Sequence, residues 1–212
     1  MENKKITKKQ KEIVCVIDRS GSMDHMRMDA IGGFNTFLEK QQKKEKNTLF
    51  TMVLFDSPMS ENIVMYNGIK IKDVKPLTTE TYIPRNGTAL YDALGETIAK
   101  VEERHVAMEN KPQVLFLILT DGEENSSKEY TQEKIKEKIE KLQKDSEWQF
   151  VYIGVTSDFI LDKNMASISM GMGISGYSGV GISGFSGYTG IHDINVAFCS
   201  MSSLGESFID SK

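Results

Sequence analysis

An aspartate and two serines follow an apolar run near the start of the chain, at a spacing that could hold a metal ion. The residues Asp18-Arg19-Ser20-Gly21-Ser22 come directly after the apolar run 13–17. A turn there can bring residues i, i+2 and i+4 to one point, and Gly21 gives the backbone the freedom to do so. One carboxylate with two hydroxyls is an all-oxygen set of donors, which suits a hard cation such as Mg²⁺.

Two more segments carry oxygen donors that could complete the same site. Thr120-Asp121-Gly122 also follows an apolar run, and Asn86-Gly87-Thr88 precedes a segment with helical spacing. Two of the three segments have a simpler interpretation, because residues 18–22 could form a local Asp/Ser turn and Thr88 is placed as a helix N-cap. In an open parallel sheet, ligands bind beyond the carboxyl ends of the strands, where both aspartates are expected. The candidate metal ligands are Asp18, Ser20, Ser22, Thr88 and Asp121.

Four apolar runs predict the strands that position these residues, at 13–17, 49–55, 114–119 and 148–155. The third run is apolar without interruption, as expected of a strand covered on both faces in a parallel sheet. The segment 62–66 follows the second run too closely for a crossover helix. We therefore predict that it is an antiparallel strand at the edge of the sheet.

Helical spacing of apolar side chains appears between the strands and near the C-terminus. The segments are 28–41, 89–105, 131–142 and 194–208, and the third has only a narrow apolar stripe among Lys and Glu. Strands alternating with helices predict an α/β fold. We expect a doubly wound, mostly parallel central sheet with one antiparallel edge strand and helices on both faces.

Three motifs together resemble the metal-ion-dependent adhesion site (MIDAS) of von Willebrand factor type A (vWA) domains. They are DRSGS at 18–22, GTALYDAL at 87–94 and LTDGEEN at 119–125, in the family's order and with fitting intervals. The resemblance covers about residues 10–165 and implies the Rossmann-like vWA fold. It also assigns the five candidate residues to one metal site.

The same resemblance implies how each residue acts. Ser20, Ser22 and Thr88 would approach the metal directly, and Asp18 and Asp121 would act directly or through water. Hydroxyls carry no formal charge, so only the two carboxylates offset the dication, and one coordination position is left for an Asp or Glu of a partner protein. The expected cation is Mg²⁺, with Mn²⁺ and Ca²⁺ as alternatives. The neighbouring acids, Glu123 and Glu124, are expected to be solvated.

The resemblance implies a protein-binding module and not an enzyme. The enzymatic alternative is a metal-dependent phosphotransferase or hydrolase, since Asp18 ends a strand as such nucleophiles do. Arg19-Ser20 in place of a second acid argues against that class. Neither a phosphate-binding G-x-x-x-x-G-K-[ST] loop nor G-x-S-x-G is present, and the three histidines lack zinc spacing. We expect His25 to be a surface residue at a helix start.

We expect one domain over residues 12–212, after a basic N-terminal extension at 1–11 whose lysines, including Lys11, are solvated. In a stretch at about 171–190, Gly recurs at nearly every third residue, which predicts a surface insertion in the domain. No proline follows Pro112, so a collagen-like triple helix is not favoured. The alternative is a phage structural or assembly component in which these triplets self-associate through Tyr177, Phe185 and Tyr188.

The composition is that of an ordinary soluble globular protein, with 212 residues, 39% hydrophobic and 26% charged. A net charge of −4 gives no argument for nucleic-acid binding. Cys15 and Cys199 do not make a disulfide framework and favour a reducing compartment. No run approaches the roughly 20 apolar residues of a membrane span. We expect a cytoplasmic protein with no membrane or nucleic-acid partner, or a virion-associated one under the phage alternative.

Overall fold

The computed structural model of the chain describes residues 9–57, 63–121, 124–146, 148–155, 188–191 and 194–211. Its centre is a six-stranded sheet in the order β3-β2-β1-β4-β5-β6. All neighbouring strands are parallel except β2 and β3, which confirms the predicted antiparallel edge strand. The strands are β1 (Lys11–Asp18), β2 (Leu49–Phe55), β3 (Ile63–Lys70), β4 (Gln113–Thr120), β5 (Trp148–Val155) and β6 (Tyr188–Ile191).

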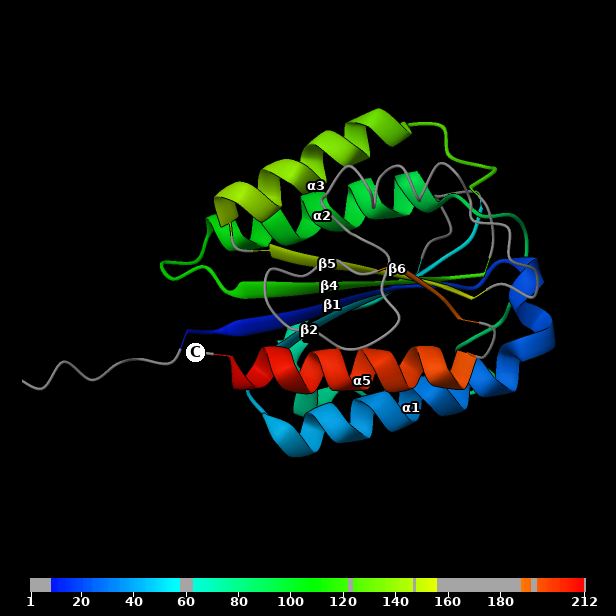
Figure 1. Ribbon diagram of the computed structural model, residues 1–212, viewed down its shortest axis with the longest axis horizontal. Coiled ribbons are helices and arrows are strands. Elements are labelled where there is room, and N and C mark those ends of the chain that lie inside the picture. The colour runs from blue at the N-terminus through cyan, green and yellow to red at the C-terminus, as the bar shows by residue number, and fades with distance from the viewer. Residues whose placement is uncertain are drawn as a thin grey trace, which may run out of the picture.

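Helices cover both faces of this sheet (Figure 1). On one face lie α2 (Leu90–Val106) and α3 (Gln132–Ser146), and on the other lie α1 (Arg27–Lys44) and α5 (Ile194–Asp210). Short 3₁₀ helices at Gly21–Met26 and Ile71–Asp73 complete the described elements. The expected doubly wound α/β architecture is therefore confirmed. No helix within the described ranges combines the length and the apolarity needed to cross a membrane.

The alternation of side chains along the central strands explains why their sequences are apolar without interruption. In β1, Ile13, Cys15 and Ile17 join the core beneath α1 and α5, whereas Val14 and Val16 join the core beneath α2 and α3. The same alternation divides β4 between the two cores. A strand covered on both faces has no solvent side that would favour polar residues.

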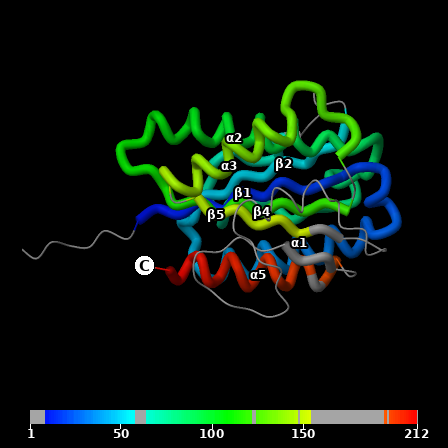
Figure 2. Tube along the Cα trace, turned by 45° about the horizontal axis from the view of Figure 1, so that its top comes forward, coloured from blue at the N-terminus to red at the C-terminus, as the bar shows by residue number. Residues whose placement is uncertain are grey.

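Helix α5 packs closely along α1 (Figure 2). A Cβ atom on Gly33 would lie 2.2 Å from the ring of Phe198, so only glycine lets the two helices approach this closely. The buried Gln41 amide donates to the carbonyl of Ser202 at 3.0 Å. These contacts fix the position of the last helix against the sheet.

The structure corrects the expectation for Lys11, which was assigned to a solvated extension. Lys11 is the first residue of β1 and is only 4% exposed. Its ammonium donates to the carbonyls of Phe208, Ile209 (3.2 Å) and Ser211 (2.5 Å), at the C-terminal end of α5. Helix C-termini have carbonyls without intrahelical partners and a negative partial charge, so a cation is stabilised there.

The Gly triplets end inside the sheet. Tyr188, Thr189 and Gly190, the last residues of the predicted insertion at 171–190, belong to the parallel edge strand β6. Residues 171–187 lie outside the described part of the chain, as do 1–8 of the basic extension and Tyr177 and Phe185 of the self-association alternative.

Candidate functional site

The predicted site residues lie beyond the carboxyl ends of β1 and β4, at the right-hand end of the sheet in Figure 1. Asp18 is the last residue of β1, and Asp121 directly follows β4. Ser20 and Ser22 lie where the chain turns into the 3₁₀ helix Gly21–Met26, and Thr88 lies just before α2. Because β1 and β4 are neighbouring parallel strands, the segments that follow them, with both aspartates and both serines, lie at one edge of the sheet, as the sequence predicts.

Hydrogen bonds join four of the five residues into one cluster. The amide of Ser20 donates to Oδ1 of Asp18 at 2.6 Å, and the hydroxyls of Ser20 and Ser22 lie 3.0 Å apart. The Ser22 hydroxyl donates to Oδ1 of Asp121 at 2.8 Å. The Thr120 hydroxyl donates to the second carboxylate oxygen of Asp18. The result is a compact group of oxygen atoms contributed by the ends of two strands.

Thr88 does not cap α2, contrary to the alternative that its position suggested. The N-cap residue of α2 is Ala89, which forms no side-chain cap. The Thr88 backbone is held instead by Asn125, whose side chain accepts from the Thr88 amide at 3.0 Å and whose amide donates to the Thr88 carbonyl at 3.1 Å. The Thr88 side chain is buried, and its hydroxyl bonds to none of the residues that the structure describes. Among the described residues nothing competes for this hydroxyl, which could serve as a ligand.

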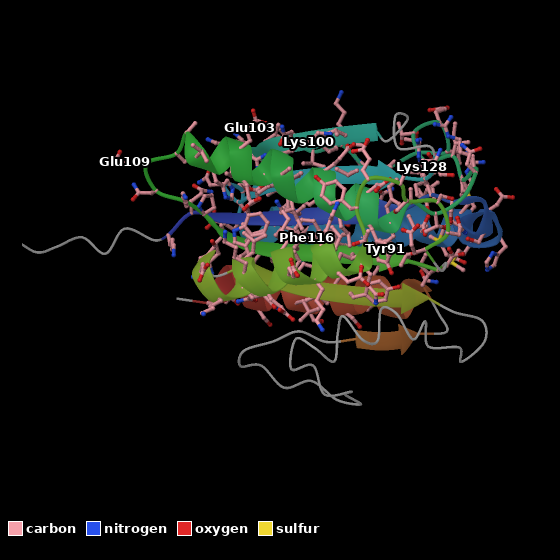
Figure 3. All side chains as sticks on the ribbon, turned by 90° about the horizontal axis from the view of Figure 1, so that it is seen from above. Tyr91, Lys100, Glu103, Glu109, Phe116 and Lys128 are labelled. Atoms are coloured by element: carbon pink, nitrogen blue, oxygen red, sulfur yellow. The ribbon has the colours of Figure 1, made fainter. Side chains whose placement is uncertain are left out.

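Side chains of the loop after β4 accept hydrogen bonds from the first amides of α2, a role that a Thr cap would otherwise have. Oε2 of Glu124 accepts from the amide of Tyr91 at 2.9 Å, and the Ser127 hydroxyl accepts from the amide of Asp92 at 3.1 Å. Figure 3 shows Tyr91 and Lys128 at the same end of the molecule. Glu124 was expected to be solvated, and that expectation is wrong because its carboxylate accepts from an amide in the first turn of α2, where amides lack partners within the helix. Glu123 lies outside the described residues.

Asp92 completes this connection between α2 and the loop, a role that its sequence position does not reveal. Its buried carboxylate accepts from the amides of Lys128, Glu129 and Tyr130 at 2.7, 2.9 and 2.8 Å. The bonds run in both directions between the helix start and the loop, so Thr88 and Asp121 are fixed relative to each other.

The turn that carries Ser20 and Ser22 is fixed by backbone bonds to the loop before α2. The amide of Gly21 donates to the carbonyl of Asn86 at 2.9 Å, and the amide of Arg85 donates to the carbonyl of Arg19 at 2.8 Å. Asn86 has a φ of 58°, in the left-handed region that Asn tolerates better than most residues. His25 is exposed, as expected, and Nδ1 of its ring lies 2.6 Å from the carbonyl oxygen of Ser22.

A close approach at Gly87 holds the same loop against the loop after β4. A Cβ atom at this position would lie 2.5 Å from Oγ of Ser126 and 2.8 Å from Oδ1 of Asn125. Cβ atoms are not found at such distances, so a side chain here would force Ser126 and Asn125 to move, and Asn125 is the residue that holds the Thr88 amide. The family-like GTALYDAL segment therefore begins with a residue whose role is to bring Thr88 to the site.

A buried ion pair lies beneath the site and was not identified in the sequence. Asp56 follows β2 and is completely buried; its Oδ2 lies 3.1 Å from Nη2 of Arg19 and 2.8 Å from Nε of Arg85. Arg19 occupies the position where a phosphotransferase would be expected to have different chemistry, and here it forms an ion pair with Asp56, which directly follows β2. The pair ties together the chain segments after β1 and β2 and before α2.

The two site aspartates differ from Asp56, because their hydrogen bonds come from hydroxyls and a backbone amide. Burial raises the pKa of Asp18 to about 7, and hydrogen bonds from Thr120 and Ser20 offset only part of that cost. Burial also raises the pKa of Asp121, despite the hydrogen bond from Ser22. A raised carboxyl pKa means that the ionised form lacks sufficient stabilisation in the protein alone, which a bound cation would supply.

The donor chemistry fits a hard divalent cation. Two carboxylates and three hydroxyls provide oxygen ligands only, the set that Mg²⁺, Mn²⁺ and Ca²⁺ prefer. Within the described ranges, no three His, Cys, Asp or Glu side chains gather in a group that could hold a metal. A site of the zinc or iron type, built on such a group, is therefore not found in that part of the chain, and the oxygen cluster is the candidate.

Comparison with known proteins places this geometry in a family. The family model described as "von Willebrand factor type A domain" matches residues 12–176. No protein among the curated sequences matches the chain. Three similar solved structures are 16–17% identical to the chain, an identity at which similarity shows the fold alone.

One of these structures is a von Willebrand factor type A protein from Catenulispora acidiphila, with a TM-score of 0.61 over 94% of this chain and 43% of that one. Manganese-loaded TRAP protein of Plasmodium vivax has a TM-score of 0.58 over 95% of this chain and 74% of that one. Proximal thread matrix protein 1 from the mussel byssus, with zinc in its MIDAS motif, has a TM-score of 0.58 over 95% and 47%.

This chain thus spans less than half of the first of these proteins. The family match covers most of the chain, and the observed sheet order and helical layers agree with it. The chain belongs to the von Willebrand factor type A domain family.

Proposed function

We propose that this domain is a divalent-cation-dependent protein-binding module. Asp18, Ser20, Ser22, Thr88 and Asp121 would hold the cation, with Mg²⁺ as the expected ion. The observation that carries the proposal is the cluster of oxygen donors, in which the completely buried Asp18 accepts from the Ser20 amide and the Thr120 hydroxyl, and the Ser22 hydroxyl contacts both Ser20 and Asp121. Keeping a buried acid in such surroundings costs stability unless a cation offsets it.

The chain's own residues would orient and restrict the ligand. Hydroxyl ligands leave the bound dication with excess positive charge, so an Asp or Glu carboxylate of a partner would gain a charge-assisted bond at an open coordination position. The turn carrying Ser22 is exposed and thus accessible to a partner, whereas Asp18 and Ser20 are buried behind it. Two similar structures, TRAP and the mussel protein, hold manganese and zinc, which supports a cation-dependent role.

The first test is thermal unfolding with and without Mg²⁺. At about a hundredfold excess of Mg²⁺ over its Kd, binding to the folded state alone adds about 2.7 kcal/mol. Asp18→Ala and Ser20→Ala should abolish this gain, whereas Asp29→Ala, which alters an exposed acid on α1, should retain it. Equal melting temperatures in Mg²⁺ and in EDTA would refute the proposed site.

A second test separates binding from catalysis. Proteins captured by the purified domain in Mg²⁺ should be released by EDTA, and the Asp18→Ala variant should not capture them. Turnover of a general phosphatase substrate by the pure protein, lost in Asp18→Asn, would instead support the phosphotransferase alternative.

A further inference from the structure

The connection that leads into α2 is long and has no helix or strand of its own. Residues 74–89 form it, and connections of this length in a compact domain usually have a function. Two side chains of α1 hold it in place. The Asn35 side chain accepts from the amide of Leu77 at 2.7 Å and donates to its carbonyl at 2.9 Å. Nε of Arg27 donates to the carbonyl of Tyr82 at 3.0 Å, so the connection is fixed against the helix at two points.

Tyr82 is the largest fully buried side chain among the described residues, although it lies in this irregular connection. Its ring is part of the core beneath α1 and α5. Its hydroxyl donates to the carbonyl of Asp18, the last residue of β1, at 2.6 Å. Burial raises the pKa of Tyr82 well above its usual range, and the nearby charges of Asp18 and Asp121 raise it further. The phenol therefore stays protonated and donates even at moderately alkaline pH.

Three hydrogen bonds join this connection to the turn that carries the candidate metal ligands. They run from Tyr82 to Asp18, from Arg85 to Arg19 and from Gly21 to Asn86, at 2.6, 2.8 and 2.9 Å. The segments 18–21 and 82–86 therefore lie side by side. Two of the three bonds join backbone groups and would form with almost any side chain at those positions. The third needs a phenol hydroxyl, so Tyr82 is the position at which residue type decides the contact.

The carbonyl that Tyr82 holds lies next to two candidate ligands in the chain. It belongs to Asp18, whose carboxylate accepts from the amide of Ser20 at 2.6 Å. A rotation of the backbone after Asp18 would move that amide, and the Ser20 hydroxyl would move with it. Ligand groups that are held in place before a metal binds give a higher affinity than groups that must first be ordered. The bond from Tyr82 holds this part of the site in place.

We propose that Tyr82 is a positioning residue of the metal site, and that its hydroxyl raises the affinity for the cation by fixing the end of β1. Tyr82 acts through the backbone of Asp18 and does not itself bind the cation. Arg27 acts one step further away, by holding the carbonyl of Tyr82. This role rests on the proposed function, because it concerns the affinity of the same cation site.

Calorimetric titration of the full chain with Mg²⁺ measures this affinity directly. Tyr82→Phe removes the hydroxyl and keeps the ring, and should raise the Kd for Mg²⁺ about tenfold. Tyr66→Phe is the matched control. Tyr66 lies within β3, and its phenol oxygen accepts from the amide of Lys75 at 3.1 Å, so this change also removes one hydrogen bond to the backbone. The control should bind Mg²⁺ with the Kd of the wild type.

Urea denaturation in EDTA separates positioning from a purely structural role. Tyr82→Phe and Tyr66→Phe each remove a hydrogen bond to a backbone group, so both should unfold at a lower urea concentration than the wild type. Only Tyr82→Phe should also lose affinity for Mg²⁺. A folded Tyr82→Phe variant with an unchanged Kd for Mg²⁺ would overturn the proposal, whatever its stability in urea.

A second variant keeps the proposal testable if Tyr82→Phe does not fold. Arg27→Ala, at the half-buried first residue of α1, removes the donor to the carbonyls of Tyr82 and Thr79. It should raise the Kd for Mg²⁺ about threefold. Because Arg27 acts through Tyr82, the double variant should bind no more weakly than Tyr82→Phe alone. A wild-type Kd in Arg27→Ala, or additive losses in the double variant, would contradict the proposed role.

The wild-type titration separates failure of this role from failure of the metal site. A wild-type chain that does not bind Mg²⁺ would refute the metal site, and the role of Tyr82 with it. A wild-type chain that binds Mg²⁺, together with a Tyr82→Phe variant of equal affinity, would refute the role of Tyr82 and leave the metal site intact.

Discussion

Strand β1 carries a completely buried carboxyl group at each end, and the surroundings of the two groups differ. Glu12, at the start of the strand, accepts from His105, Thr51 and Arg104. Asp18, at its end, accepts from one hydroxyl and one backbone amide. The pKa of Glu12 is lowered although burial alone would raise it, whereas burial raises the pKa of Asp18 to about 7.

The difference indicates that the Glu12 charge has a structural role, whereas the Asp18 charge is suited to binding a ligand. The Glu12 carboxylate is matched by Arg104 and hydrogen-bonded by His105 near the end of α2, so it joins that helix to the sheet. Among the residues that the structure describes, Asp18 has no such cationic contact, and its neighbours are hydroxyls suited to a metal. A buried charge without a matching charge is costly, and such groups concentrate at functional sites.

The largest expected effect on stability comes from removing the Glu12 charge, which is paired with Arg104. Glu12→Gln leaves the Arg104 cation without its anion, and should lower the free energy of unfolding by about 4 kcal/mol. Urea denaturation near neutral pH measures the loss. A change below about 1 kcal/mol would show that the pair contributes little and that the two ends are more alike than proposed.

Measuring the free energy of unfolding across a pH series tests the surroundings of Asp18, the carboxyl group without a cationic partner. The folded pKa of Asp18, about 7, exceeds the ordinary value of 3.8, so between these values the folded state holds a proton that the unfolded state has released. Stability from this group is present below pH 3.8 and is lost as pH rises toward 7. In EDTA the wild type should lose about 3 kcal/mol relative to Asp18→Asn across this window.

The same series run with Mg²⁺ provides the control. The cation binds the ionised carboxylate, so the added stability should grow with pH in the wild type and be absent in Asp18→Asn. Parallel curves for both proteins in EDTA would contradict the raised pKa of Asp18.

A smaller effect is expected at the glycine that brings the metal-site loops together. Gly87→Ala would push its methyl group into Ser126 and Asn125, and should cost about 1–2 kcal/mol while weakening Mg²⁺ binding. Gly32→Ala is the matched control, because nothing lies within 4 Å of its added Cβ. This change in α1 should stabilise the protein by up to about 1 kcal/mol and leave Mg²⁺ affinity unchanged. Calorimetric titration and urea denaturation measure both.

The smallest effect on stability is expected at an exposed ion pair, which serves as a reference for the buried pair at Glu12. Lys43 and Glu39 are 74% and 65% exposed and lie at i,i+4 on α1. Water solvates both charges, so Lys43→Gln should unfold at the same urea concentration as the wild type. A clear loss of stability there would mean that pairing as such, and not burial, sets the cost at Glu12.

Much of the fold could be predicted because its signals are local. The apolar runs at 49–55 and 148–155 are β2 and β5 within the same bounds, and the helical spacing in 89–105 gives α2 to within a residue at each end. The strand-end motifs also predicted that Asp18, Ser20, Ser22 and Asp121 meet. Their role in binding a cation stays a prediction for the Mg²⁺ experiments.

Other expectations failed where a distant partner decided the outcome. Lys11 looked like part of a solvated basic run, yet its amine is buried by carbonyls about 200 positions away in the sequence. Glu124 looked like a loop acid, yet it caps the start of α2. For Thr88, predicted as a metal ligand, the alternative role of helix cap is not seen, because the N-cap position of α2 is Ala89. Residue type and neighbouring residues do not encode such pairings.

The sequence by itself determined the periodicities, and with them the strands, the helices and the oxygen donors placed at strand ends. Only the tertiary structure decided which buried acid would be matched by a cation, because Glu12 meets Arg104 and His105 across more than 90 residues. That decision depends on the packing of α2 along β1. The same packing brings His105 to Trp148, and it leaves Asp18 among hydroxyls at the opposite end of the strand.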